Sequence, residues 1–131
     1  MIEYLDNRLL DPVEVAHLFE ASGIARPTKD IPRIARMFAN ANLVISAWDG
    51  PRLVGVSRAL TDFSYCCYLS DLAVDIAYQK QGIGRELIRR TQSLVGDEVS
   101  IVLLSASGAM TYYPKVGLKL ADNAYLLSRK R

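Results

Sequence analysis

Hydrophobic and polar positions along this chain follow two spacings, which predict strands and helices in a definite order. Apolar runs of strand length occupy residues 2–5, 43–48, 52–59, 65–74 and 99–105. Apolar residues recur at helical spacing within residues 11–22, 30–40, 82–95 and, more briefly, 106–112. Two short runs at 118–120 and 125–128 close the chain as further strand candidates. The predicted order is therefore strand, two helices, three strands, helix, strand, helix and two final strands.

Local signals at the ends of these elements support the assignment. Asp11 and Pro12 open the first helix with a side-chain cap and a proline at the first position. Asp49-Gly50 between two apolar runs favours a hairpin turn. The run at 99–105 is apolar almost throughout, as buried parallel strands between helices tend to be. With no linker and no internal repeat, the sequence predicts one α/β domain over residues 1–131.

Composition narrows the class of protein. Half of the 131 residues are hydrophobic and 23% are charged, as in a folded globular domain. The net charge of +2 is too small to indicate nucleic acid binding, and no apolar run reaches the about 18 residues that span a membrane. Cys66 and Cys67 point to opposite faces of a strand and have no other cysteine to pair with. Unpaired cysteines are typical of a reducing compartment, so we expect a cytoplasmic protein. Because His17 is the single histidine and Cys66-Cys67 lacks the spacing of zinc ligands, we expect no bound metal.

The junction between the strand at 65–74 and the helix at 82–95 carries the strongest chemical signal. The first N–H groups of a helix have no intrahelical partner, and the helix dipole adds partial positive charge there. A phosphate or pyrophosphate is the natural occupant of such a site. Gly82 and Gly84 let an anion approach the backbone closely, and Lys80 adds a full positive charge.

Two well-known phosphate loops do not fit this junction. A P-loop requires lysine and then serine or threonine after its second glycine, where this chain has Arg85-Glu86. A dinucleotide-binding fingerprint requires a third glycine where this chain has Leu87. The remaining pattern is Gln79-x-x-Gly82-x-Gly84, directly after a strand.

That pattern resembles the acyl-coenzyme A signature of the Gcn5-related N-acetyltransferase (GNAT) superfamily. Two further segments resemble motifs of the same family in the same order: the hairpin Asp49–Gly55, and Ala109–Leu118, which is similar to Ala-x-x-Phe-Tyr-x-Lys-x-Gly-Phe. The resemblance implies the GNAT acyl-CoA N-acyltransferase fold, an α/β (α+β) architecture with a mixed central sheet and helices on both faces. It also implies a V-shaped splay of the sheet after the strand that ends at Val74.

The resemblance further implies a site for acetyl-CoA, the expected cosubstrate. The pantetheine arm would lie against the exposed edge of the strand that ends at Val74, and an N–H near Val74 would polarise the thioester carbonyl. The pyrophosphate would lie on N–H groups of the junction. The predicted cofactor-binding residues are Leu72, Val74, Gln79, Lys80, Gln81, Gly82, Ile83, Gly84 and Arg85.

The implied activity is N-acetyl transfer from acetyl-CoA to a primary amine of a small molecule or peptide, by direct attack through a tetrahedral intermediate. Tyr113 matches the tyrosine that often protonates the leaving thiolate in this family, and a phenol keeps its proton at neutral pH. Tyr112 is interpreted as a packing residue. Ser70 and Asp71 are candidate acceptor-binding residues, since relatives that act on polyamines often carry Glu-Asp there. Asp71 could hold a water or a cationic amine, or be tied to the backbone; without a side-chain base, water would relay the proton.

Departures from the family pattern keep an alternative function open. Ala106 stands where the family often has an asparagine, and Ser70 replaces the glutamate. Pro114 predicts that the short helix ends at Tyr112. The alternative is a non-catalytic or weakly active GNAT-fold module that binds CoA or acetyl-CoA as a ligand or sensor. An unrelated α/β domain would have to produce three ordered motif matches by coincidence.

Segments outside the motifs give expectations about partners. Residues 24–29, between the first two helices, are expected to border the acceptor cleft, and their positive charge argues against a strongly cationic acceptor. The last strands are expected to be exposed to a second copy of the chain, which predicts a homodimer.

Overall fold

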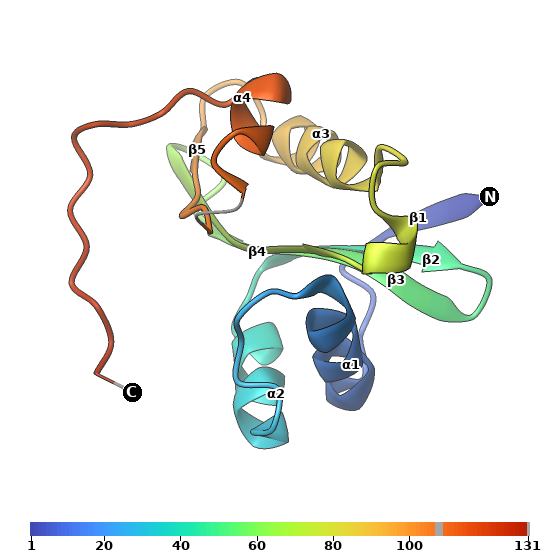
Figure 1. The fold of residues 1–131 in the computed structure, drawn as a ribbon. Coiled ribbons are helices and arrows are strands. Elements are labelled where there is room, and N and C mark those ends of the chain that lie inside the picture. The colour runs from blue at the N-terminus through green and yellow to red at the C-terminus, as the bar shows by residue number, and fades with distance from the viewer. Residues whose placement is uncertain (107–108, 131) are drawn as a thin grey trace.

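A five-stranded sheet forms the centre of the molecule in the computed structural model, which describes residues 1–106 and 109–130. The strands follow the order β1-β2-β3-β4-β5 and comprise β1 (Ile2–Asp6), β2 (Leu43–Asp49), β3 (Arg52–Thr61), β4 (Cys66–Val74) and β5 (Ser100–Val102). The helices are α1 (Pro12–Ser22), α2 (Ile31–Ala39), the 3-10 helix η1 (Ile76–Tyr78), α3 (Ile83–Val95) and α4 (Tyr112–Lys115). Figure 1 shows α1 and α2 on one face of the sheet and α3 and α4 on the other. The predicted α/β architecture with helices on both faces is confirmed.

The sheet is mixed, and it opens along β4. Strands β1 to β4 pair antiparallel, and β4 pairs parallel with β5. The parallel ladder joins only Cys66–Tyr68 to Ser100–Val102. Beyond Tyr68, β4 continues to Val74 with no strand on that edge among the described residues. The predicted V-shaped splay is therefore present, and the free edge of β4 borders it.

The helix starts differ in a way that matters for the site. Asp11 caps α1 by accepting the Val13 N–H at 2.9 Å, and Asp30 caps α2 by accepting the Arg33 N–H at 3.1 Å. These aspartates satisfy N–H groups that a helix start leaves unpaired. Helix α3 begins instead after Gly82, which has no side chain to make such a bond.

Both faces of the sheet bury apolar residues. Phe19 and Ile34 anchor α1 and α2 on one face, and Leu87 packs α3 against the other. The apolar spacing within residues 82–95 predicts one inward face for α3, and Ile83, Leu87, Ile88, Thr91 and Val95 are buried there. Leu94 departs from that pattern, since it is 43% exposed at the margin of the helix face. No helix in the described part of the chain is long and apolar enough to cross a membrane.

The segment after α3 departs from the prediction. The run at 99–105 forms only β5, because only that part finds a partner in β4. The helix predicted at 106–112 begins instead at Tyr112 and ends at Lys115, and residues 107–108 lie outside the described residues. Pro114 lies in the first turn of α4. Proline is tolerated there because its missing N–H would have no intrahelical partner.

The strands predicted at 118–120 and 125–128 are absent, so that prediction is wrong. Residues after Leu118 run away from the sheet (Figure 1), and Leu120 and Tyr125 are 79% and 101% exposed. An apolar run forms a stable strand only when neighbouring strands pair with it. No described strand pairs with this segment, a fact that the local sequence cannot reveal.

Candidate acyl-coenzyme A site

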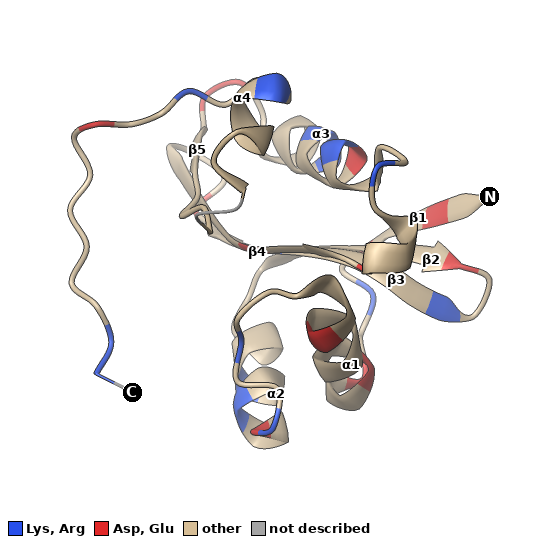
Figure 2. Ribbon diagram, in the orientation of Figure 1, with Lys and Arg blue, Asp and Glu red and all other residues tan. Residues whose placement is uncertain are grey.

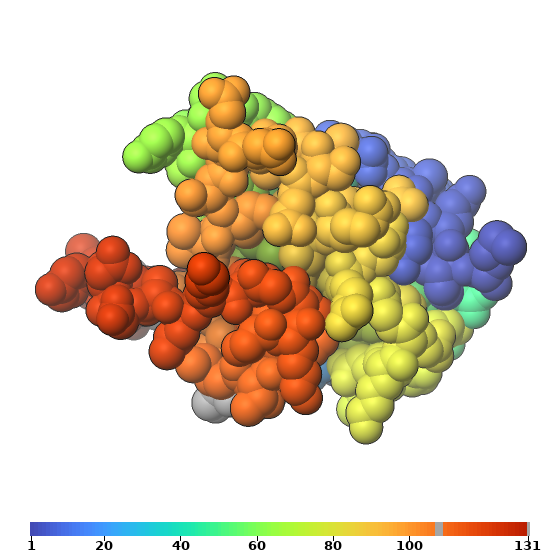
Figure 3. Space-filling view, turned by 90° about the horizontal axis from the view of Figure 1, so that it is seen from above, coloured from blue at the N-terminus to red at the C-terminus, as the bar shows by residue number. Residues whose placement is uncertain are grey.

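A cavity of about 680 Å³ lies between the junction before α3 and the chain around α4. Figure 3 looks onto this face, where the segment before α3 (yellow) lies beside the segment of α4 (orange-red). The lining residues are Leu72, Val74, Tyr78, Gln79, Lys80, Gly82, Ile83, Gly84, Arg85, Ala109, Tyr112, Tyr113, Lys115 and Val116. The structure thus brings eight of the nine predicted cofactor residues together. Gln81 is exposed and does not line the cavity.

Backbone N–H groups without an intrahelical partner lie at the start of α3, in residues that line this cavity. The first intrahelical hydrogen bond runs from the Glu86 N–H to the Gly82 carbonyl at 3.0 Å. The N–H groups of residues 83–85 therefore precede the hydrogen-bonded ladder. Lys80 and Gly82 have φ angles of 67° and 85°, in the left-handed region. Alternation of left- and right-handed residues is how backbone N–H groups form an anion-binding nest.

The charges around the cavity have one sign. Lys80, Arg85 and Lys115 line it, and none of its described lining residues is acidic. Figure 2 colours the ribbon blue, for lysine or arginine, in the loop before α3, near the start of α3 and on α4. The helix dipole of α3 adds to their field at the same end. The electrostatics therefore favour an anionic ligand at this junction.

Glycine at position 84 allows the side chain of Tyr112 to approach the start of α3 closely. A Cβ built on Gly84 would lie 2.7 Å from the Tyr112 hydroxyl oxygen, closer than side chains normally approach. The hydroxyl of Tyr112 thus reaches the first turn of α3. The sequence interpretation of Tyr112 as a packing residue missed this contact, since the spacing of 28 residues carries no local signal.

Tyr113 lies in the wall of the cavity, next to Tyr112. The two rings meet edge-on with their centroids 5.3 Å apart. Burial raises the pKa of Tyr113, the neighbouring Tyr112 raises it further, and the positive charge of Arg26 lowers it in part. Burial also raises the pKa of Tyr112, against the lowering effect of Arg85. Both phenols therefore carry their protons at neutral pH.

Hydrogen bonds tie the junction to the end of β4. The Gln79 side-chain amide donates to the Val74 carbonyl at 2.9 Å. Asp75 caps η1 by accepting the Ala77 N–H at 2.9 Å, and it is held by Arg52 at 2.7 Å. These contacts position the loop before α3 relative to the free edge of β4.

Ser70 and Asp71 lie outside the cavity. The Asp71 side chain is fully buried, and its two oxygens accept from Arg26 Nε at 2.6 Å and Arg58 Nε at 2.5 Å. The Ser70 carbonyl accepts from Arg26 Nη2 at 2.8 Å, and the Ser70 hydroxyl accepts from Arg58 Nη2 at 2.9 Å. Asp71 therefore holds two guanidinium groups, a role that the sequence did not indicate. Arg58 is its partner in the β3–β4 register, but a bulge beside Ala59 hides that pairing from the sequence.

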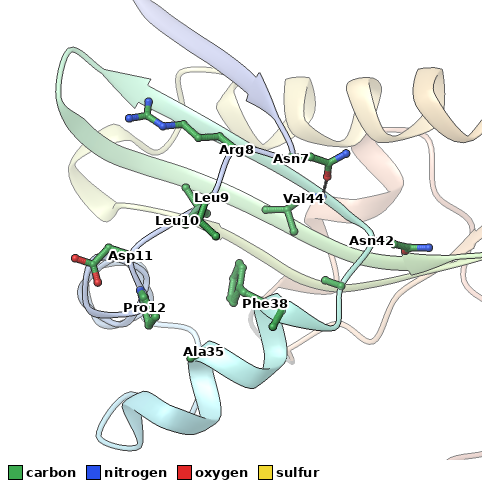
Figure 4. A pocket seen from close by; sticks show the side chains of 12 residues that line it. Asn7, Arg8, Leu9, Leu10, Asp11, Pro12, Ala35, Phe38, Asn42 and Val44 are labelled. Atoms are coloured by element: carbon green, nitrogen blue, oxygen red, sulfur yellow. Dashed lines mark hydrogen bonds between the residues drawn. The ribbon is translucent and has the colours of Figure 1, made fainter.

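Two other cavities contain none of the predicted site residues. One of about 640 Å³ lies between the β1–α1 connection and α2, with Leu10 and Phe38 in its wall (Figure 4). Its Asn7 side chain is engaged by the Val44 N–H at 2.8 Å. A smaller cavity of about 260 Å³ includes His17. Within residues 1–106 and 109–130, no three His, Cys, Asp or Glu side chains come together to hold a metal ion.

Comparisons with known proteins agree on one family. The Acetyltransferase (GNAT) domain family matches residues 15–125. An uncharacterized N-acetyltransferase of Prochlorococcus marinus, described as ycf52-like, is 28% identical over 119 residues, which cover 86% of this chain and 65% of that protein. The chain thus spans less than two thirds of the length of this relative.

Solved structures share the fold. A probable acetyltransferase from methicillin-resistant Staphylococcus aureus, SA2161, superposes with a TM-score of 0.86 at 19% identity, over all of both chains. The aminoglycoside N-acetyltransferase AAC(6')-Iy, solved in complex with CoA, gives a TM-score of 0.73 at 10% identity over 100% of this chain and 96% of that one. From the family match over most of its length, the chain belongs to the GNAT family of acetyltransferases.

Proposed function

We propose that this GNAT domain transfers an acetyl group from acetyl-CoA to a primary amine of a small molecule or peptide. The observation that carries the proposal is the cavity in which the uncapped start of α3 meets the free edge of β4. Family membership supports acetyl transfer in general. The acceptor and the residues that act on it are inferences from the cavity.

The cavity offers contacts for two parts of acetyl-CoA, the pyrophosphate and the pantetheine arm. The N–H groups at the start of α3, with Lys80 and Arg85 beside them, would bind the pyrophosphate. Leu72 and Val74 would contact the pantetheine arm, and the unpaired edge of β4 offers it backbone donors and acceptors. Gly84 leaves the approach open, as a Cβ there would already crowd Tyr112.

Tyr113 is the proposed general acid. When bound, acetyl-CoA supplies the acetyl group as an activated thioester. Tyr113 lines the cavity beside Leu72, and burial holds its proton in place at neutral pH, so its hydroxyl can protonate the departing thiolate. Asp71 lies outside the cavity and is bonded to two arginines, and the described lining of the cavity contains no carboxylate. We therefore assign removal of the amine proton to water.

Release of free thiol from acetyl-CoA in the presence of a panel of amines tests this function. We expect saturable, amine-dependent release by the wild-type protein. Tight binding of acetyl-CoA without release by any amine would favour the alternative of a CoA-binding ligand module or sensor. Absence of acetyl-CoA binding would contradict both.

We also propose that the chain forms a homodimer through its C-terminal segment. Leu120, Tyr125 and Leu127 are exposed on an extended stretch, and β5 has no second partner among the described strands. Removal of exposed apolar surface from water by a second copy of the chain would stabilise the dimer. Light scattering should report twice the mass of one chain, and the mass of a single chain after removal of residues 119–131; a wild-type monomer would contradict the proposal.

A further inference from the structure

The cluster around Asp71 presents excess positive charge on the α1 and α2 side of the sheet. It contains the guanidinium groups of Arg26 and Arg58 and the single carboxylate of Asp71, so two positive charges face one negative charge. The side chain of Arg58 is 10% exposed, whereas that of Arg26 is 26% exposed. The uncompensated charge is therefore accessible at Arg26.

Arg26 is held rigidly and still has hydrogen-bond donors to offer. Besides Asp71, it donates to the Ala25 carbonyl at 2.7 Å and to the Ser70 carbonyl at 2.8 Å. A guanidinium group has five N–H donors, so two have no partner among the described residues. An arginine fixed in this way is pre-organised to bind a planar oxyanion such as a carboxylate.

Arg26 is anchored to β4 next to the cavity that Tyr113 lines, through its bonds to the Ser70 carbonyl and the Asp71 carboxylate. Its positive charge lowers the pKa of Tyr113 in part. Asp71, the partner of Arg26, is followed directly in β4 by Leu72, which lines the cavity with Tyr113. Successive strand residues point to opposite faces. Leu72 therefore points to the face of the sheet with the acetyl-CoA cavity, and Asp71 points to the opposite face, where it holds Arg26. The opening of the sheet beside β4 lies between the two.

Two acidic groups flank the α1–α2 connection. Glu20, in α1, accepts the Thr28 hydroxyl at 2.9 Å, and Asp30 caps α2. Lys29, in the same connection, is exposed and adds positive charge. The hydrogen bonds to Glu20 and Asp30 come from neutral donors and leave both carboxylates charged, so the anion-binding group on this side is Arg26 itself.

We infer that Arg26 binds a carboxylate of the acceptor, so that the acceptor is an amine carrying a carboxylate in the same small molecule. The inference rests on the proposed function and adds the substrate class. The amine would lie at the splay near Tyr113, and the carboxylate would accept from the two remaining N–H groups of Arg26. A polyamine would meet repulsion at the same place.

The test compares acceptors that differ only in the anion. The panel comprises α-amino acids and ω-amino acids of two to six carbons, each beside its carboxamide, together with alkylamines and a polyamine. Thiol release gives kcat/KM for each member. Calorimetric titration of each amino acid into the CoA-bound protein gives its affinity independently of turnover. The variants are Arg26→Gln and, as a control with the same substitution at an exposed arginine of α2, Arg36→Gln.

For at least one amino acid, we expect the wild-type protein to prefer the carboxylate over the carboxamide by at least tenfold. Arg26→Gln should bring the ratio close to one, and Arg36→Gln should leave it unchanged. Both kcat/KM values in a ratio are measured on the same preparation. Partial unfolding of a variant lowers both by the same factor and leaves the ratio unchanged. Equal use of acids and amides, preference for the polyamine, or an unchanged ratio in Arg26→Gln would overturn the inference. Acetyl-CoA binding, measured separately, shows whether the proposed function itself has failed.

Discussion

Replacement of Asp71 by asparagine should destabilise the fold rather than remove a catalytic base. Asparagine preserves the shape of the side chain but removes the charge that Arg26 and Arg58 share. The Arg58 side chain, only 10% exposed, would keep its positive charge without a carboxylate partner. Breaking a buried ion pair in this way costs about 3–5 kcal/mol. Since Arg26 is partly solvated, we expect the lower end, about 3 kcal/mol.

Urea denaturation followed by circular dichroism measures this loss. With an m value of roughly 1.5 kcal/mol/M, a loss of about 3 kcal/mol moves the midpoint down by about 2 M. Asp97→Asn, an exposed carboxylate in the turn after α3, is the matched control and should change stability by less than about 0.5 kcal/mol. If Asp71→Asn kept its midpoint and lost turnover instead, Asp71 would act as a base and the structural role argued here would be refuted.

Two further predictions concern the acid and the pH dependence of stability. Tyr113→Phe should lower kcat by about 100-fold or more, with an unchanged Kd for acetyl-CoA, whereas Tyr112→Phe should retain most of the rate. Single-turnover release of thiol measures both variants, and equal losses would argue against Tyr113 as the acid. Asp62 accepts N–H bonds from Ser64, Cys66 and Tyr65, which lower its pKa from 3.8 to about 2. A depressed folded-state pKa stabilises the fold above pH 3.8, and this contribution is lost as the pH falls toward 2. Asp62→Asn should therefore unfold at lower urea than wild type at pH 7, and the difference should shrink as the pH falls toward 2. A difference at pH 2 as large as the one at pH 7 would contradict this origin.

The sequence predicts well wherever the relevant signal is local. Asp11 caps its helix as its position predicts, because a cap needs only the next two or three residues. The junction from Gln79 to Arg85 is equally local, and the cavity forms where its glycines and charges predicted it.

The errors arise where a residue depends on a distant partner. The apolar run at 125–128 has a strand-like composition, but no described strand lies beside it to complete the hydrogen bonds. Asp71 depends on Arg26, which is 45 residues away in the sequence. Pro114 indicated a helix end, yet its place in the first turn made it compatible with a helix start. Each of these outcomes is set by the tertiary fold.

Titration calorimetry with acetyl-CoA tests the central claim, that the start of α3 binds this cosubstrate. We expect saturable binding by the wild-type protein, tighter than the binding of NADH. Gly84→Ala should weaken it at least tenfold, the effect of losing about one charge-assisted hydrogen bond. Alanine favours the helix by about 1 kcal/mol, so the variant should stay folded. Absence of acetyl-CoA binding, or the same Kd in Gly84→Ala, would contradict the account.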